Sequence, residues 1–173
     1  MSNQQVVILG VGNVLHADDG IGVKTLQYLD SQYEFPEGVT LVDGGTVGAQ
    51  LDVSIANKDW VIVIDALAVE GTPGEVRVLT GGDLVDRQGA TRMSPHQVCF
   101  LDLIQLLKIE GTQPKRLDLV GIVPGRIEEF AKMTSAVDHA MDEVVDTLLE
   151  MLKAEDILPL KRDPALKPNY WWL

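Results

Sequence analysis

Three aspartates stand at the ends of apolar segments, where carboxylates can meet a substrate or a metal ion. The segments are short and almost wholly apolar, which predicts strands buried on both faces: Val6–Gly10, Val39–Asp43 and Trp60–Ala66. Asp19 lies in the loop after the first segment, Asp43 ends the second, and Asp65 lies near the end of the third. Ligands of open α/β sheets gather beyond the carboxyl ends of the strands, so these positions predict a site at one edge of a sheet.

Asp65 is the most unusual of the three because it directly follows the apolar run Val61–Ile64. Burying a carboxylate without a partner is costly, so its side chain needs a metal ion, a cation or backbone N–H groups. Two interpretations are therefore open. Asp65 contributes to a functional site, or it caps a helix and accepts hydrogen bonds from loop amides.

A histidine is placed near these acids by a helix start. Ser94 is a suitable N-cap, Pro95 suits the first helical position, and Gln97 completes a capping box. His96 then lies in the first turn, where the helix dipole disfavours the imidazolium form and leaves a neutral ring that can bind a metal. A purely structural role for this histidine is equally compatible with the pattern.

Two carboxylates and one imidazole suit an open site for a divalent metal such as nickel or zinc. The candidates are Asp19, Asp65 and His96. The only cysteine, Cys99, excludes a disulfide framework and a thiolate cage, so any histidine-based site must be completed by acids. The other histidines, His16 and His139, fall in a loop and on a helix and are interpreted as bystanders. The sequence places the two acids together more firmly than it places His96.

Dinucleotide binding is the main competing interpretation, because the pair Gly10-x-Gly12 follows a strand. The third glycine of the fingerprint is replaced by Leu15. Asp18 and Asp19 would also repel a phosphate at the helix N-terminus, where anions normally bind. A serine hydrolase is not supported either, because the Gly-x-Ser-x-Gly elbow is absent. We therefore expect no bound nucleotide.

The composition narrows the class of protein. The 173 residues include 46% hydrophobic ones, enough for the core of one domain, and the net charge is -12. This acidity argues against binding to nucleic acid or to an anionic membrane surface. The N-terminus lacks the basic region of a signal peptide, and no apolar run is long enough to cross a bilayer. We expect a cytoplasmic protein.

The order of the elements predicts an α/β fold. Helix-like segments at Gly20–Tyr33 and Ala49–Asn57 separate the three strands, which favours parallel neighbours. The Gly71–Gly74 turn is too short for a crossover helix, so strand Glu75–Thr80 should run antiparallel to Trp60–Ala66. Three more elements complete the pattern, a helix, a fifth strand and a strongly amphipathic last helix: His96–Ile109, Arg116–Val123 and Ser135–Ala154.

Two details concern the end of the chain. Ser135 and Asp138 form a capping signature for the last helix. We expect one domain over residues 1–158 and a tail over 159–173, which holds two of the three tryptophans. The tail either docks on its own domain or binds a partner.

Four motifs in register resemble those of the [NiFe]-hydrogenase maturation endopeptidases, and the resemblance extends from about Val6 to Leu152. A fifth-strand segment, Gly121-Ile122-Val123-Pro124, also fits the family pattern. The four motifs are Gly10-x-Gly12-Asn13-x-Leu15-x-x-Asp18-Asp19-Gly20-x-Gly22, Asp43-Gly44-Gly45-Thr46, Asp65-Ala66 and Ser94-Pro95-His96-Gln97.

The resemblance implies a three-layer α/β/α sandwich, with a five-stranded mixed sheet in which one strand is antiparallel. It also implies a monomeric protease that removes the C-terminal extension of the hydrogenase large-subunit precursor after nickel insertion. The nickel belongs to the substrate and serves as the recognition signal, and Asp19, Asp65 and His96 would contact it. Asp43 would act as a general base or would brace the Gly44-Gly45 turn. A non-proteolytic, nickel-sensing chaperone of the precursor is the alternative.

Overall fold

The protein is built on a five-stranded mixed sheet with the strand order β3-β1-β4-β6-β5. The computed structural model describes residues 4–46, 51–81, 95–170 and 172, and only the backbone of residues 95–99. Four strands are parallel and β5 is antiparallel to its neighbour β6. The strands are β1 (Val6–Val11), β3 (Val39–Gly45), β4 (Trp60–Ala66), β5 (Val76–Thr80) and β6 (Arg116–Ile122). The predicted sheet, with its one antiparallel strand, is confirmed.

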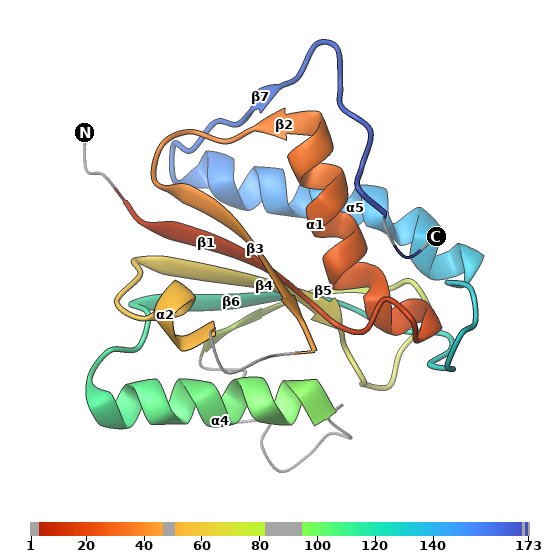
Figure 1. Cartoon of the computed structure of the whole chain (residues 1–173), viewed down its shortest axis with the longest axis horizontal. Coiled ribbons are helices and arrows are strands. Elements are labelled where there is room, and N and C mark those ends of the chain that lie inside the picture. Colours follow the sequence, from red (N-terminus) through yellow and green to blue (C-terminus); the bar gives the residue numbers. More distant parts are fainter. Residues whose placement is uncertain (1–3, 47–50, 82–94, 171, 173) are drawn as a thin grey trace.

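Helices cover both faces of this sheet and complete the three predicted layers (Figure 1). One face carries α1 (Ile21–Gln32) and α5 (Ser135–Ala154), and the other carries α2 (Leu51–Ile55) and α4 (Pro95–Glu110). A short 3-10 helix, η1 (Ala17–Gly20), leads directly into α1. None of the helices within the described residues combines the length and the hydropathy that a bilayer-spanning segment needs.

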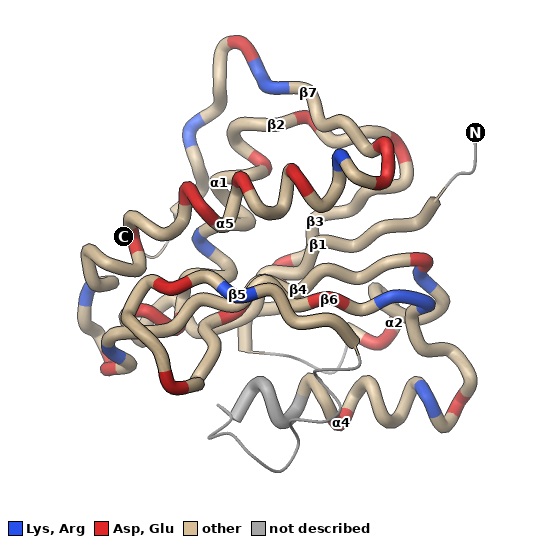
Figure 2. The backbone as a smooth tube through the Cα atoms, turned by 180° about the vertical axis from the view of Figure 1, so that it is seen from behind, with Lys and Arg blue, Asp and Glu red and all other residues tan. Residues whose placement is uncertain are grey.

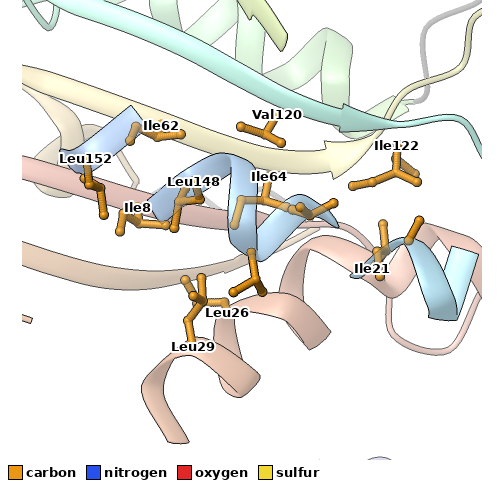
Figure 3. Packing of buried hydrophobic residues seen from close by; sticks show 14 of the residues in the cluster. Ile8, Ile21, Leu26, Leu29, Ile62, Ile64, Val120, Ile122, Leu148 and Leu152 are labelled. Atoms are coloured by element: carbon orange, nitrogen blue, oxygen red, sulfur yellow. The ribbon is translucent and has the colours of Figure 1, made fainter. Parts of the chain in front are cut away.

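The central strands divide their side chains between two cores. Ile8, Ile62 and Ile64 pack against α1 and α5, where Leu29 and Leu148 meet them (Figure 3). The alternate residues of the same strands pack against α2 and α4. Because both faces are covered, these strands are apolar at nearly every position, and this explains why the sequence lacks polar alternation there.

The antiparallel strand β5 lies at the edge of the sheet beside β6, not beside β4. Its direction is opposite to that of β4, as the short turn predicted, but β6 separates the two strands. Gly74 N donates to Val123 O (2.8 Å), and Val123 N donates to Glu75 O (2.9 Å). The turn therefore crosses the end of β6 before β5 begins, and a contact distant in sequence decides the pairing.

Helix α5 has the predicted bounds, but its predicted capping box is wrong. Its N-cap is Thr134, not Ser135, and no side chain caps it. The Thr134 hydroxyl donates instead to Asp18 Oδ2 (2.9 Å), and Asp138 accepts a hydrogen bond from Lys24 Nζ. Contacts between elements have replaced the local capping pattern.

The tail docks on its own chain, which is the first of the two predicted alternatives. A two-residue strand β7 (Leu160–Lys161) pairs antiparallel with β2 (Tyr33–Glu34). Leu166 N then donates to Ser31 O at the end of α1 (2.9 Å), and Tyr170 lies 5.8 Å from Lys24 Nζ, measured to the ring centre. The tail therefore runs along α1, while the domain boundary at residue 158 stays a prediction.

Docking should delay the loss of the Tyr170 proton as the pH rises. Burial, followed by the charge of Asp138 and the nearby Tyr28, raises the pKa of Tyr170 from 10.0 to about 12. The folded chain therefore holds this proton more tightly, so the stabilising contribution is complete below pH 10 and is lost as the pH rises through 12. Titration by the ultraviolet absorbance of tyrosinate should show a late step that Tyr170→Phe removes and Tyr33→Phe keeps. A late step that survives in Tyr170→Phe would contradict this docking.

Candidate active site at the carboxyl edge of the sheet

The register of the parallel strands brings the predicted acids to one edge. Gly10 in β1 is aligned with Asp43 in β3 and with Ile64 in β4. Asp65, the next residue of β4, is aligned with Gly121 in β6. The ends of β1, β3 and β4 therefore meet at the same place, as the sequence predicted.

Gly12 allows the loop that carries Asp19 to approach β4. It has a φ of +125°, and a side chain there would place its Cβ 1.8 Å from the carbonyl oxygen of Asp19. The same Cβ position is 3.7 Å from Asp65 Oδ1. Only glycine fits this position, because both the backbone conformation and the contact exclude a side chain. Gly12 is thus bordered by the Asp19 backbone and by the Asp65 carboxylate.

Both acids are buried, each with 2% of its surface exposed. Asp19 Oδ2 accepts a hydrogen bond from Asn13 N (2.9 Å), and Asp65 Oδ1 accepts one from Ala66 N (2.8 Å). The hydrogen bond from the backbone amide of Ala66 is one of the two roles that the sequence left open for Asp65, the structural one. It leaves a functional role open too, since an ionised carboxylate has two oxygens that accept several hydrogen bonds or a metal.

The place of His96 is described only in part. Its backbone lies in the first turn of α4, which begins at Pro95 as predicted, but its side chain lies outside the described residues. Among the side chains that the structure describes, no three His, Cys, Asp or Glu form a metal-binding group. The ligand set of Asp19, Asp65 and His96 therefore stays a prediction.

Asp43 braces the turn that follows it. Its Oδ1 accepts a hydrogen bond from Gly45 N (2.9 Å), and Gly45 has a φ of +46°. Gly45 O in turn accepts from Gly12 N (2.7 Å), which ties β3 to the loop beside Asp19. The bracing role is therefore observed. The side chain is also exposed, so the role of Asp43 as a general base stays a separate prediction.

The structure adds Asp18, to which the sequence motif assigns no role of its own. Asp18 is 0% exposed, and its carboxylate accepts hydrogen bonds from the backbone N–H groups of Gly125, Arg126 and Thr134, at 2.8, 2.8 and 2.6 Å. These bonds hold the segment between β6 and α5 against η1. The sequence shows only an acidic pair, and nothing in it distinguishes the anchoring Asp18 from its neighbour Asp19.

Asp18→Ala should strongly destabilise the protein, because it leaves three backbone N–H groups without their buried acceptor. We expect the free energy of unfolding to fall by about 3 kcal/mol or more, measured as a lower urea midpoint at an unchanged m-value. Asp18→Asn keeps one carbonyl acceptor and should lose clearly less. Equal stability of wild type and Asp18→Ala would refute the anchoring role.

The side chains of the remaining histidines are at least partly exposed, although His16 O accepts a hydrogen bond from Asp19 N (3.1 Å). His16 is partly exposed, and its Nε2 is 3.8 Å from Glu129 Oε1 on the surface. His139 is exposed on α5. Their interpretation as bystanders stays a prediction.

Comparison with known proteins identifies the family. The sequence model of the hydrogenase maturation proteases matches residues 23–151 of this chain. The chain belongs to that family. The "Hydrogenase 2 maturation protease" of Escherichia coli K12 is 31% identical over 160 residues, which are 92% of this chain and 97% of the relative. The "Hydrogenase expression/formation protein HoxM" of Azotobacter vinelandii is 34% identical, over 94% of this chain and 79% of the relative.

Solved structures agree with this assignment. The hydrogenase maturating endopeptidase HybD from E. coli superposes with a TM-score of 0.86 at 30% identity, over 94% of this chain and all of that one. HybD from Thermococcus kodakarensis has a TM-score of 0.71 at 24% identity, over 86% of this chain and 99% of that one, and supports the fold. This maturation protease is therefore a peptidase, and the family favours peptide hydrolysis over the nucleotide-binding interpretation.

Proposed function

We propose that this maturation protease removes the C-terminal extension from the nickel-loaded precursor of a [NiFe]-hydrogenase large subunit, as a monomer in the cytoplasm. The observation that carries the proposal is the pair of buried acids, Asp19 and Asp65, gathered around Gly12 at the carboxyl edge of the sheet. Two carboxylates on one buried edge concentrate negative charge, which a divalent cation on the substrate would neutralise.

The donor set fits nickel that the precursor carries. Carboxylate oxygens of Asp19 and Asp65 and an imidazole nitrogen of His96 suit a late first-row metal, which would then bridge the enzyme and its substrate. Binding of this kind makes the later cleavage effectively intramolecular. The protein itself then orients the precursor, binds it by hydrogen bonds and shields the reacting groups from water at the carboxyl edge of the sheet.

Two routes to hydrolysis are compatible with this arrangement. In the first, the substrate's metal polarises the peptide carbonyl or activates the attacking water. In the second, the metal serves only for docking, and Asp43 removes a proton from the water. Asp43→Asn separates them: the second route predicts loss of cleavage with unchanged binding of the precursor, whereas the first predicts continued cleavage.

The proposed function is tested with two forms of the same precursor, one loaded with nickel and one free of it. Incubation with the purified protein should release the C-terminal peptide, detected by mass spectrometry, from the loaded form only. Equal cleavage of both forms would refute nickel-gated recognition. Binding of the loaded precursor without cleavage of either form would identify a chaperone instead of a protease.

A further inference from the structure

A cavity of about 610 Å³ lies beside the loop that carries Asp19, on the face of the sheet covered by α1 and α5. Its size is within the range of small-molecule and peptide side-chain sites. Five parts of the chain form its walls: the loop and η1 over residues 14–20, Lys24 of α1, residues 130–133 between β6 and α5, Asp138 of α5, and Trp172 of the tail. Leu15 and Gly20 are positions of the first sequence motif, whereas the other lining residues are not motif positions.

Two apolar residues of the cavity wall are exposed and are joined by a backbone hydrogen bond. Leu15 is 42% exposed and Phe130 is 83% exposed, and Phe130 N donates to Leu15 O (2.7 Å). Phe130 has a φ of +56°, which is unusual for a bulky residue and costs on the order of 1 kcal/mol or more. The fold therefore keeps a large aromatic side chain in water, where a partner can cover it.

The charge of the cavity differs from that of the whole chain. The chain has a net charge of -12, and Figure 2 shows acidic residues along α5. The cavity walls nevertheless carry Lys24 and Lys132 against one acid, Asp138. Lys24 pairs with Asp138, so the exposed Lys132 leaves one positive charge in excess among the lining side chains. Such a surface complements an acidic group.

The cavity also adjoins the candidate active site. Ala17 and Gly20 line it, and Asp19 lies between them in η1. Asp18 ties the same short helix to Gly125, Arg126 and Thr134, in the segment that supplies Phe130. A group bound in the cavity would therefore lie within one helical turn of the backbone of Asp19.

We infer that this cavity is an exosite for the precursor, which binds an apolar side chain next to an acidic residue of the substrate. The inference rests on the proposed function and extends it to a second contact beyond the acids. The apolar group packs against Leu15, Phe130 and Trp172, and the acidic group pairs with Lys132. A second copy of this chain is a poor occupant, because two molecules with a charge of -12 repel each other.

The first test compares steady-state processing of nickel-loaded precursor by two cavity variants and two matched controls. Phe130→Ser and Lys132→Glu should raise KM about tenfold with kcat within about twofold of wild type, since each removes a binding contact. Ile109→Ser changes an apolar residue of equal exposure (84%) at the far end of α4, and Lys153→Glu makes the same charge reversal in the last turn of α5. Both controls should behave like wild type.

The second test reports binding without cleavage. A photoreactive benzoylphenylalanine at position 130 should crosslink to the precursor, at an apolar residue beside an Asp or Glu, whereas the same group at position 109 should not. Crosslinking of position 130 to another copy of this chain, or to nothing, would overturn the exosite. If wild type cleaves the precursor and the cavity variants have the same KM as the controls, the exosite is overturned but the proposed function stands. If wild type cleaves no precursor at all, the proposed function is overturned.

Discussion

Asp19→Asn and Asp65→Asn should each lower kcat/KM for processing of nickel-loaded precursor on the order of 10³-fold, the effect expected when an electrostatic or metal-contacting group is lost. Asparagine keeps a carbonyl oxygen that can accept the bonds from Asn13 N and Ala66 N, so the fold should survive. His96→Ala should likewise abolish processing, because the proposed imidazole contact with nickel is lost. The fold should stay intact, because a histidine in the first turn of a helix contributes little to core packing. Initial rates of peptide release at several precursor concentrations measure the effect.

Binding provides the independent measurement. Wild type should bind nickel-loaded precursor more tightly than the nickel-free form, and the Asp19→Asn and Asp65→Asn variants should lose this difference. Full activity of either variant would show that the substituted carboxylate has no role in processing. Retained nickel discrimination with lost cleavage would assign the acids to hydrolysis and not to recognition.

Asp118 offers a matched control, since it is also 2% exposed but lies near the other end of the sheet. It accepts hydrogen bonds from Trp60 Nε1 (2.9 Å) and Arg116 Nε (2.7 Å), and the Arg116 guanidinium lies 4.1 Å from the centre of the Trp60 ring. Asp118→Asn should reduce stability by about 2 kcal/mol, because a hydrogen bond to a charged group is weakened. Its processing rate should be unchanged. Asp118→Asn should therefore lower stability without changing activity, whereas Asp19→Asn and Asp65→Asn should lower activity without unfolding the protein.

Gly22→Ala should cause a large loss of stability through the addition of a single methyl group. Alanine normally stabilises a helix interior by about 0.5–1 kcal/mol relative to glycine. Here a Cβ on Gly22 would lie 2.2 Å from both Ile64 O and Val11 O, and backbone oxygens cannot rotate away. Helix α1 would have to move off the sheet. We expect the free energy of unfolding to fall by about 3 kcal/mol.

Gly111→Ala is the control for this effect. Gly111 has a φ of +72°, and no heavy atom lies within 4 Å of the position that a Cβ would occupy, so alanine there adds conformational strain of about 1 kcal/mol but no clash. Guanidinium unfolding followed by circular dichroism should rank wild type above Gly111→Ala and Gly111→Ala above Gly22→Ala. Gly22→Ala should also impair processing, since α1 directly follows the η1 turn that carries Asp19. A Gly22→Ala protein as stable as wild type would show that α1 does not pack this closely.

The sequence by itself determined the elements that depend on local pattern. Continuous apolar runs marked β1 and β4, because a parallel strand covered on both faces buries every side chain. The apolar stripe of Ser135–Ala154 indicated the bounds of α5, because helical periodicity depends only on residues three and four apart. Glycine spacing and strand-end acids also indicated where Asp19, Asp43 and Asp65 would meet.

Tertiary structure decided whatever depends on contacts between distant segments. Asp18 and Asp19 have the same side chain, but burial against residues 125–134 makes Asp18 an anchor, while Asp19 lies at the edge with Asp65. The edge position of β5 follows from a turn that crosses β6, and the cavity has its Trp172 wall only because the tail returns along α1. Local propensity extends over a few residues, whereas these features are selected by burial and hydrogen bonding across the whole fold.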